Sequence, residues 1–300
     1  MSEQIPLSDE ARADRTEADA QRDDGTRAVL SDVAYKRLGI VNVAYFGKAN
    51  AGSGSWVLID AGVAGTAGMI RRAAEERFGE NARPAAIIMT HGHFDHAGAL
   101  ETLAEEWDVQ IYAHELELPF LNGTASYPPP DPSVGGGMMA LLSPMYPRGP
   151  YDVSRWLQPL PADGNVPHMP GWKWIAVPGH TPGQIALWRE GDRVLIAADA
   201  FITTRQESAY AVAAQKPEMH GPPMYYTQDW NAARESVQRL AALEPELVIT
   251  GHGLAMQGPE MRAALHQLAQ NFDSIAVPED GKYVREPASL ESGGAYRPAS

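Results

Sequence analysis

The chain has 300 residues, of which 44% are hydrophobic and 21% are charged, as expected for a globular protein with a substantial core. Its 24 Lys and Arg against 38 Asp and Glu give a formal net charge of −14, which argues against nucleic acid or an anionic membrane as the main partner. It contains no cysteine, which excludes disulfides and thiolate metal ligands. Because it has neither an apolar run of about 18 residues nor a basic start followed by an apolar segment, we expect no membrane span, no secretory signal and a cytoplasmic location.

Taken from the N-terminus, the sequence predicts three regions. Residues 1–26 carry eight Asp or Glu against three Arg and little that can be buried, so we expect a mobile acidic arm. Residues 27–277 are predicted to form a single domain, and the polar residues 278–300 a loose tail. Near the start of the domain, two apolar runs at 41–46 and 55–60 flank a Gly-rich loop and predict a β-hairpin.

Four ligand-type side chains follow the apolar run 85–89, which predicts a buried strand. They are His91, His93, Asp95 and His96. They lie in the turn that leaves a strand end, where an α/β scaffold usually holds its chemistry. Such a tight turn lets the first two histidines point to one metal, while the last two residues point to a neighbouring one. Imidazole and carboxylate are the ligand types that suit zinc and its first-row relatives.

Three more ligand-type residues, His180, Asp199 and His252, follow or end short strand-like runs elsewhere in the chain. These runs are 174–177, 194–197 and 247–250. A histidine-rich surface turn would need no such partners. We therefore interpret the seven residues as the ligands of a metal site rather than as surface polar groups.

Apolar residues at helical spacing predict four helices. They are expected at about 66–78, around 100–107, at about 229–243 and from Pro259 to Phe272. The helix around 100–107 follows the histidine turn directly, so we expect it to pack behind that turn.

Residues 119–170 form an excursion dense in Pro and Gly that is too long for an ordinary connection. Its methionines, among them Met138 and Met145, would give an apolar and adaptable surface. We interpret the excursion either as a lid or pocket wall that contacts substrate, or as a segment that packs on its own core or on a second copy in a homodimer.

The irregular run 201–226 comes directly after Asp199 and is expected to border the pocket. Tyr210, His220 and Tyr225 are therefore candidate substrate contacts. For each of them, packing in the interior is the alternative.

With these residues the chain resembles the metallo-β-lactamase superfamily of metal-dependent hydrolases. The His-x-His-x-Asp-His box of that family corresponds to residues 91–96, and its later ligand positions match His180, Asp199 and His252. Its early structural aspartate matches Asp60, which we expect to orient the ligand turns by hydrogen bonds rather than to bind metal. The resemblance covers roughly residues 41–272 and implies an α/β (α+β) fold, the four-layer αββα sandwich.

The resemblance also implies a cofactor of two divalent metal ions. It assigns one metal to His91, His93 and His180, the other to Asp95, His96 and His252, and the bridging position to Asp199. Zinc is the expected metal, although manganese, iron and cobalt accept the same donors. The implied nucleophile is a hydroxide that bridges the metals, with Asp95 as the catalytic residue that takes or relays the proton.

The expected partner is a small-molecule substrate, and hydrolysis of a lactone or carboxylic ester is the leading expectation. A glyoxalase II-like thioesterase is less favoured because only about one helix and a sparse tail follow His252. Lactonases of this fold often carry a tyrosine three residues after the bridging aspartate, where this chain has Ile202. Organophosphate or aryl-ester hydrolysis stays open, as do two other classes, a mononuclear iron dioxygenase of the persulfide type and a non-catalytic binding protein.

Overall fold

The computed structural model describes residues 5–14, 25–214, 216–290 and 296–297. The chain forms two compact units. The N-terminal unit comprises Asp14–Ser126 and Gly149–Trp174, and the C-terminal unit comprises Met1–Ala13, Tyr127–Arg148 and Ile175–Ser300. The Pro- and Gly-rich excursion is therefore divided between the two units.

The N-terminal unit contains a seven-stranded sheet in the order β2-β3-β4-β5-β6-β7-β8. Its strands are β2 (Arg27–Leu30), β3 (Val33–Leu38), β4 (Val41–Phe46), β5 (Val57–Ile59), β6 (Ala86–Ile88), β7 (Gln110–Ala113) and β8 (Leu157–Pro159). Strands β2 to β5 pair antiparallel, so the predicted hairpin is confirmed, and β5 to β8 pair parallel. Because parallel strands end at the same sheet edge, the turns that follow β5, β6 and β7 gather there.

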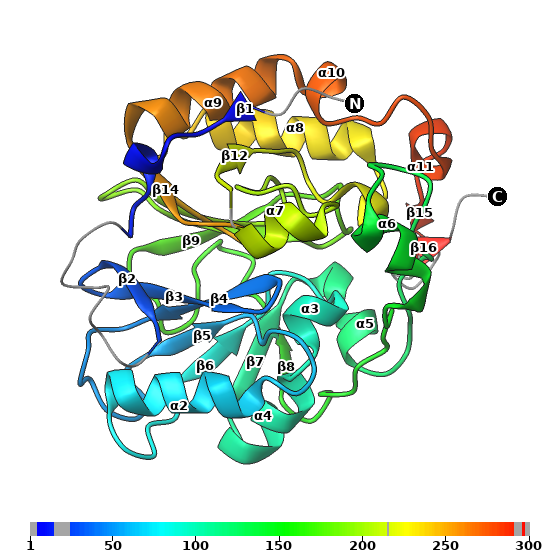
Figure 1. Ribbon diagram of the computed structural model, residues 1–300. Coiled ribbons are helices and arrows are strands. Elements are labelled where there is room, and N and C mark those ends of the chain that lie inside the picture. The colour runs from blue at the N-terminus through cyan, green and yellow to red at the C-terminus, as the bar shows by residue number, and fades with distance from the viewer. Residues whose placement is uncertain (1–4, 15–24, 215, 291–295, 298–300) are drawn as a thin grey trace. The chain divides into compact units, whose positions relative to one another are not determined.

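Two helices cover one face of this sheet, α2 (Ala67–Phe78) and α4 (Leu100–Trp107) (Figure 1). Both confirm helices predicted from apolar spacing. Their anchor is aromatic: the ring of Trp56 stacks on Phe78 at 4.5 Å and meets Trp107 edge-on at 5.7 Å. The unit also holds α3 (Phe94–Ala97), η2 (Glu115–Glu117) and α5 (Leu118–Leu121).

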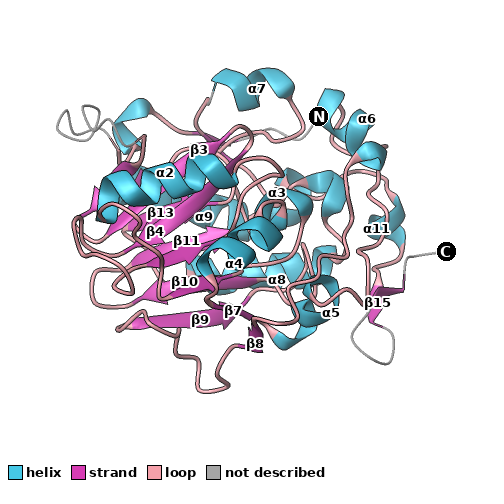
Figure 2. Ribbon diagram, turned by 90° about the horizontal axis from the view of Figure 1, so that it is seen from below, coloured by secondary structure: helices cyan, strands magenta, loops and turns pink. Residues whose placement is uncertain are grey.

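The C-terminal unit is built on a five-stranded sheet in the order β14-β13-β11-β10-β9, with β9 at the boundary of the units. Figure 2 shows β13, β11, β10 and β9 side by side in this order. The strands are β9 (Trp172–Ala176), β10 (Ile185–Arg189), β11 (Val194–Ala198), β13 (Leu247–Thr250) and β14 (Met256–Gln257). Since β11 and β13 pair parallel, the residues that follow them leave the same edge of the sheet.

The predicted helices α8 (Trp230–Ala241) and α9 (Gly258–Gln270) pack beside each other in this unit (Figure 1). Its shorter elements are β1 (Ile5–Pro6), η1 (Asp9–Ala11), α6 (Met138–Leu142), η3 (Ser143–Met145), α7 (Ala209–Ala214), β12 (Glu218–Met219), η4 (Met224–Tyr226), α10 (Phe272–Ile275), α11 (Lys282–Arg285), β15 (Ser289–Leu290) and β16 (Tyr296–Arg297). Among the described helices, none has both the length and the apolar character that crossing a bilayer requires.

The first residues differ from the expected mobile arm. Strand β1 pairs with β12 through Ile5 and Met219, and the Ala13 amide donates to the Ala255 carbonyl at 2.9 Å. The Ser8 hydroxyl donates to the Glu260 carboxylate at 2.6 Å. A few apolar side chains among the acidic ones are enough to bury this stretch, because each contacts a preformed surface. The rest of the predicted arm, residues 15–24, lies outside the described residues.

The tail also differs from the expectation for its described part. The hydroxyl of Tyr283 donates to the Pro129 carbonyl at 2.6 Å, and the Lys282 amide donates to the Asp131 carboxylate at 2.6 Å. Tyr283 is buried, and Ala288 forms a small cluster with it. One aromatic residue thus holds an otherwise polar segment against residues 129–131.

A pH-dependent contribution to stability is expected at His114, which caps η2 by accepting the Leu116 amide at Nδ1 (3.2 Å). Burial lowers the pKa of His114, against a smaller opposing effect of Glu115. Its neutral form is therefore favoured on folding, so this contribution is complete above the unfolded pKa of about 6.5 and is lost as the pH falls through the lowered folded value.

We expect His114→Asn, which keeps an acceptor for the cap, to lose less stability than the wild type when the pH is lowered from about 8 to about 5. Urea unfolding midpoints of both proteins at the two pH values measure this difference. The same loss in both proteins would show that His114 carries no such contribution.

Candidate metal centre

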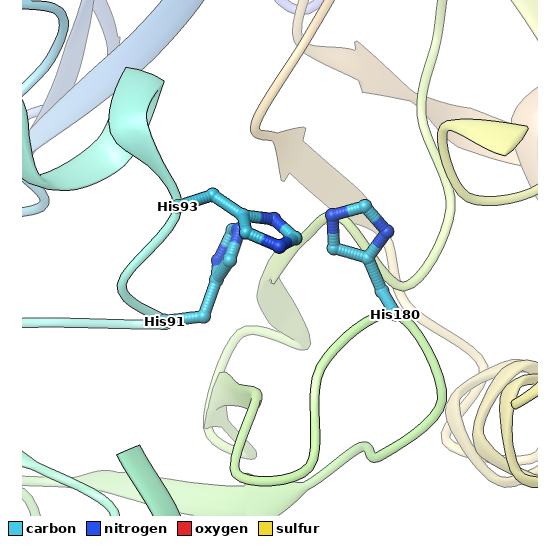
Figure 3. Close-up of side chains that lie close together, drawn as sticks. All are labelled: His91, His93 and His180. Carbon is cyan, nitrogen blue, oxygen red and sulfur yellow. The ribbon is translucent and has the colours of Figure 1, made fainter. Parts of the chain in front are cut away.

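The histidine turn of the N-terminal unit leaves β6 and enters α3 (Figure 3). The ring centroids of His91 and His93 lie 4.8 Å apart and those of His91 and His96 lie 4.1 Å apart. The first turn of α3 carries both Asp95 and His96. All four residues of the box are buried. The structure thus brings the three imidazoles of the box together, as the sequence predicts.

Asp60 is the centre of the hydrogen bonds that hold this turn. It follows β5 with a left-handed φ of 62°. One carboxylate oxygen accepts the Thr90 amide at 2.7 Å, and the other accepts the Thr90 hydroxyl at 2.8 Å. That second oxygen also lies 2.8 Å from Nδ1 of His96. One side chain therefore joins the ends of β5 and β6, in the orienting role expected for it.

These hydrogen bonds determine which nitrogen of each imidazole is available to a metal. Nδ1 of His96 must carry the proton that Asp60 accepts, so the lone pair of this ring lies on Nε2. Nδ1 of His91 lies 3.1 Å from the Thr90 hydroxyl oxygen, whose own proton goes to Asp60. The hydroxyl can then only accept from His91, which again leaves the lone pair on Nε2.

Two further residues of this unit interact with groups of the box, Glu117 by a hydrogen bond and Tyr151 through the charge of Asp95. Glu117 is fully buried and accepts the Gly92 amide at 3.0 Å, in the middle of the histidine box. Burial, and then the negative charges of Asp95 and Glu101, raise the pKa of the Tyr151 hydroxyl, so it stays neutral. Neither residue lies near the box in sequence, so no local pattern reveals it.

The C-terminal unit supplies the second group of ligand-type residues. His180 lies on the loop after β9, Asp199 directly follows β11, and His252 follows β13 (Figure 3 for His180). Nε2 of His252 lies 3.0 Å from Oδ2 of Asp199, and Nε2 of His180 lies 3.5 Å from the same oxygen. All three side chains are buried. Two imidazole nitrogens thus face one carboxylate oxygen.

The tautomer of His180 is determined in the same way as in the other unit. Its Nδ1 lies 3.2 Å from the hydroxyl of Thr227, which donates to the Pro223 carbonyl at 2.8 Å. The hydroxyl therefore accepts from Nδ1, and Nε2 keeps its lone pair. Thr227 lies 47 positions from His180, which is why sequence reasoning missed it.

Two glycines allow the loops that carry His180 and His252 to pack closely against neighbouring backbone and side chains. A Cβ at Gly179 would lie 2.3 Å from the backbone nitrogen of Ala233, and one at Gly253 would lie 2.4 Å from the hydroxyl of Thr203. Their φ angles are +130° and +95°. Any side chain here would displace the neighbouring ligand, His180 or His252.

The predicted substrate contacts fall into two groups in the C-terminal unit. Tyr210, Met138 and Met145 are 79%, 58% and 80% exposed. Tyr225 and His220 are buried, and Nδ1 of His220 donates to the Gly221 carbonyl at 2.8 Å. Contact with substrate stays a prediction for all five.

The donor chemistry of the seven residues fits divalent metals. They provide five imidazoles and two carboxylates, all buried. For His91, His96 and His180 the hydrogen bond at Nδ1 leaves the lone pair of Nε2 available to a metal. Metal-binding histidines commonly have their other ring nitrogen hydrogen-bonded in this way. Such a set of nitrogen and oxygen donors suits zinc, manganese, iron or cobalt.

We expect Asp60→Asn to weaken metal binding about 10- to 100-fold while the protein stays folded. Asparagine tolerates the left-handed backbone at this position, but its amide cannot serve as the anionic acceptor for both Thr90 and His96. Competition with a chelator measures the affinity, and Asp192→Asn on the surface is the matched control. Wild-type affinity in Asp60→Asn would contradict this role.

Comparison with known proteins gives the family. The model of the metallo-beta-lactamase superfamily matches residues 37–252. "Probable metallo-hydrolase YflN" of Bacillus subtilis (strain 168) is 51% identical over 221 residues, which are 74% of this chain and 84% of that protein. "Probable metallo-hydrolase YybB" of the same organism is 28% identical over 170 residues, 57% of this chain and 64% of that protein.

Solved structures show the same fold at low sequence identity. A metallo-beta-lactamase family protein from Thermus thermophilus, TTHA1429, has a TM-score of 0.54 at 20% identity and covers 82% of this chain and 81% of its own. The subclass B3 metallo-beta-lactamase BJP-1 of Bradyrhizobium japonicum has a TM-score of 0.54 at 18% identity, over 83% and 92% of the two chains. The predicted αββα fold is confirmed. The chain therefore belongs to the metallo-beta-lactamase superfamily and is a metal-dependent hydrolase.

Proposed function

We propose that this protein is a dinuclear metal-dependent hydrolase that cleaves a lactone or a carboxylic ester. The observation that carries the proposal is the Asp199 carboxylate, with Nε2 of His252 at 3.0 Å and Nε2 of His180 at 3.5 Å from one of its oxygens. A carboxylate shared by two imidazoles is what a pair of neighbouring metals needs as a bridge.

The proposal assigns the seven residues to two ions. His91, His93 and His180 would hold one ion, Asp95, His96 and His252 would hold the other, and Asp199 would be a ligand of both. Zinc is the proposed metal. When bound, such ions would supply a water of lowered pKa, about 7, and would polarise the electrophilic carbonyl group.

The protein's own groups have separate tasks in this reaction. Asp95 is a buried carboxylate that accepts the proton and passes it to the leaving group. Burial and the charge of Asp95 raise the pKa of Tyr151, so its hydroxyl stays neutral and can donate a hydrogen bond to substrate. Asp60 and Thr90 keep the imidazoles in the required tautomers without contacting substrate.

An apolar substrate fits the surface of the C-terminal unit. Among its described residues, five large hydrophobic side chains are exposed, and all belong to α6, η3 or α7. They are Met138, Leu141, Leu142, Met145 and Tyr210. Flexible methionines adapt to apolar groups of different shape, which favours esters with hydrophobic acyl or alcohol parts.

We expect Asp199→Ala and His96→Ala to lower hydrolysis by more than about a hundredfold, because removing a ligand costs more than disturbing its outer contact. Metal analysis should show less than the full complement of two ions, while circular dichroism stays unchanged. Asp192→Ala is the control. Near-normal turnover in either ligand variant would refute the dinuclear assignment.

A substrate panel tests the bond that is cleaved. On protein with its native metal, we expect lactones and alkyl esters of carboxylic acids to be hydrolysed faster than thioesters, aryl esters or phosphotriesters. Metal analysis of the same sample separates a further class, since one iron per chain with oxygen consumption fits only a dioxygenase. Fastest turnover of a thioester or phosphotriester would replace the proposed substrate class.

A further inference from the structure

A cavity with a volume of about 890 Å³ lies within the C-terminal unit. None of the seven metal ligands lines it. Its wall includes the loop Gly135–Gly137, the side chains of Arg205 and Met224, and the segment 274–280 that connects α10 to the tail. We propose that this cavity binds a small organic monocarboxylate, with the carboxylate on Arg205 and an apolar body against the apolar residues of the lining. The volume is in the range of small-molecule sites, about 300 to 1,000 Å³.

Arg205 is the cation that this wall presents. Its side chain is half-buried, and among the described residues it makes one hydrogen bond, from Nη2 to the Gly135 carbonyl at 3.3 Å, and no ion pair. A guanidinium carries five N–H donors, so most of them stay available to a ligand. Their planar fork matches a carboxylate with two parallel hydrogen bonds.

The glycine loop that holds Arg205 is itself fixed. Gly135, Gly136 and Gly137 have φ angles of +73°, +61° and +100°. A Cβ at Gly135 would lie 2.5 Å from Cγ of Glu207, and one at Gly137 would lie 2.4 Å from the Glu207 carbonyl oxygen. The loop is therefore in close contact with the residue two positions after Arg205, which presets the geometry of the site.

Glu207 connects this loop to Met224, another residue that lines the cavity. The residue is fully buried, and one of its carboxylate oxygens accepts the Met224 amide at 2.8 Å. Its other oxygen lies 3.3 Å from Nε2 of the buried His220. The hydrogen bond from Met224 and the close contact of the glycine loop with Glu207 fix this part of the wall, which reduces the ordering cost of binding.

The remaining lining sets the class of ligand. Val134, Ile275 and Val277 offer apolar surface to the body of a ligand. Glu279 and Asp280 are exposed, and Asp280 pairs with Arg285 at 3.7 Å, so the charge of Glu279 is the one set against that of Arg205. One carboxylate with an apolar chain satisfies both the arginine and the apolar lining, whereas a multiply charged anion such as phosphate adds charge that Glu279 repels and has no apolar part.

Titration of the metal-loaded full-length protein with hexanoate, 1-hexanol and inorganic phosphate tests the proposal by calorimetry. We expect hexanoate to bind at least about tenfold more tightly than 1-hexanol, since a charge-assisted pair adds more than about 1.4 kcal/mol. Phosphate should not bind at the same concentrations. Arg205→Gln should lower hexanoate affinity about tenfold or more and leave 1-hexanol unchanged.

The controls separate this site from the metal centre, which can also coordinate carboxylates. Arg72→Gln, an exposed arginine on α2, should bind hexanoate like the wild type. Hexanoate binding that persists in Arg205→Gln but disappears in His96→Ala would place the ligand on the metal and overturn the proposal. Equal affinity for hexanoate and 1-hexanol would also overturn it. Arg205→Lys, which keeps the charge but not the fork, serves if Arg205→Gln does not fold, and it too should bind hexanoate more weakly.

Discussion

The carboxylate of Asp60 is the contact on which the histidine turn of the N-terminal unit depends. It accepts from the backbone and the hydroxyl of Thr90 and from the imidazole of His96, and through Thr90 it also determines the proton position on His91. A histidine that offers its lone pair to a metal must have its other nitrogen occupied. One buried anion meets that requirement for two rings at once.

In the C-terminal unit, a neutral hydroxyl rather than a carboxylate occupies the Nδ1 atom of the histidine. Thr227 occupies Nδ1 of His180 and gives its own proton to a backbone carbonyl. The anion of this unit, Asp199, lies instead on the Nε2 side of His180 and His252. Asp60 therefore lies on the Nδ1 side of His96, whereas Asp199 lies on the Nε2 side of His180 and His252, and the bridging role proposed for Asp199 rests on this difference.

Much of this centre could be read from the sequence, because its ligands follow short apolar runs and each strand end is a local signal. The supporting groups could not. Thr90 and Asp60 are separated by 30 positions, and Gly92 and Glu117 by 25, so only the parallel pairing of the strands brings them together. The termini were also predicted incorrectly for their described residues. Composition averaged over an acidic stretch hides the few apolar residues, such as Ile5 and Tyr283, that decide whether it packs.

The contact between the tail and the excursion has a practical consequence for work on this protein. Tyr283 and Lys282 donate hydrogen bonds to Pro129 and Asp131. The residues just before them, up to Asp280, line the cavity. Truncation that removes Lys282 and Tyr283 would therefore take away contacts beside the wall of the carboxylate-binding cavity proposed above. A purification tag should be attached where it leaves the hydrogen bonds of Lys282 and Tyr283 intact.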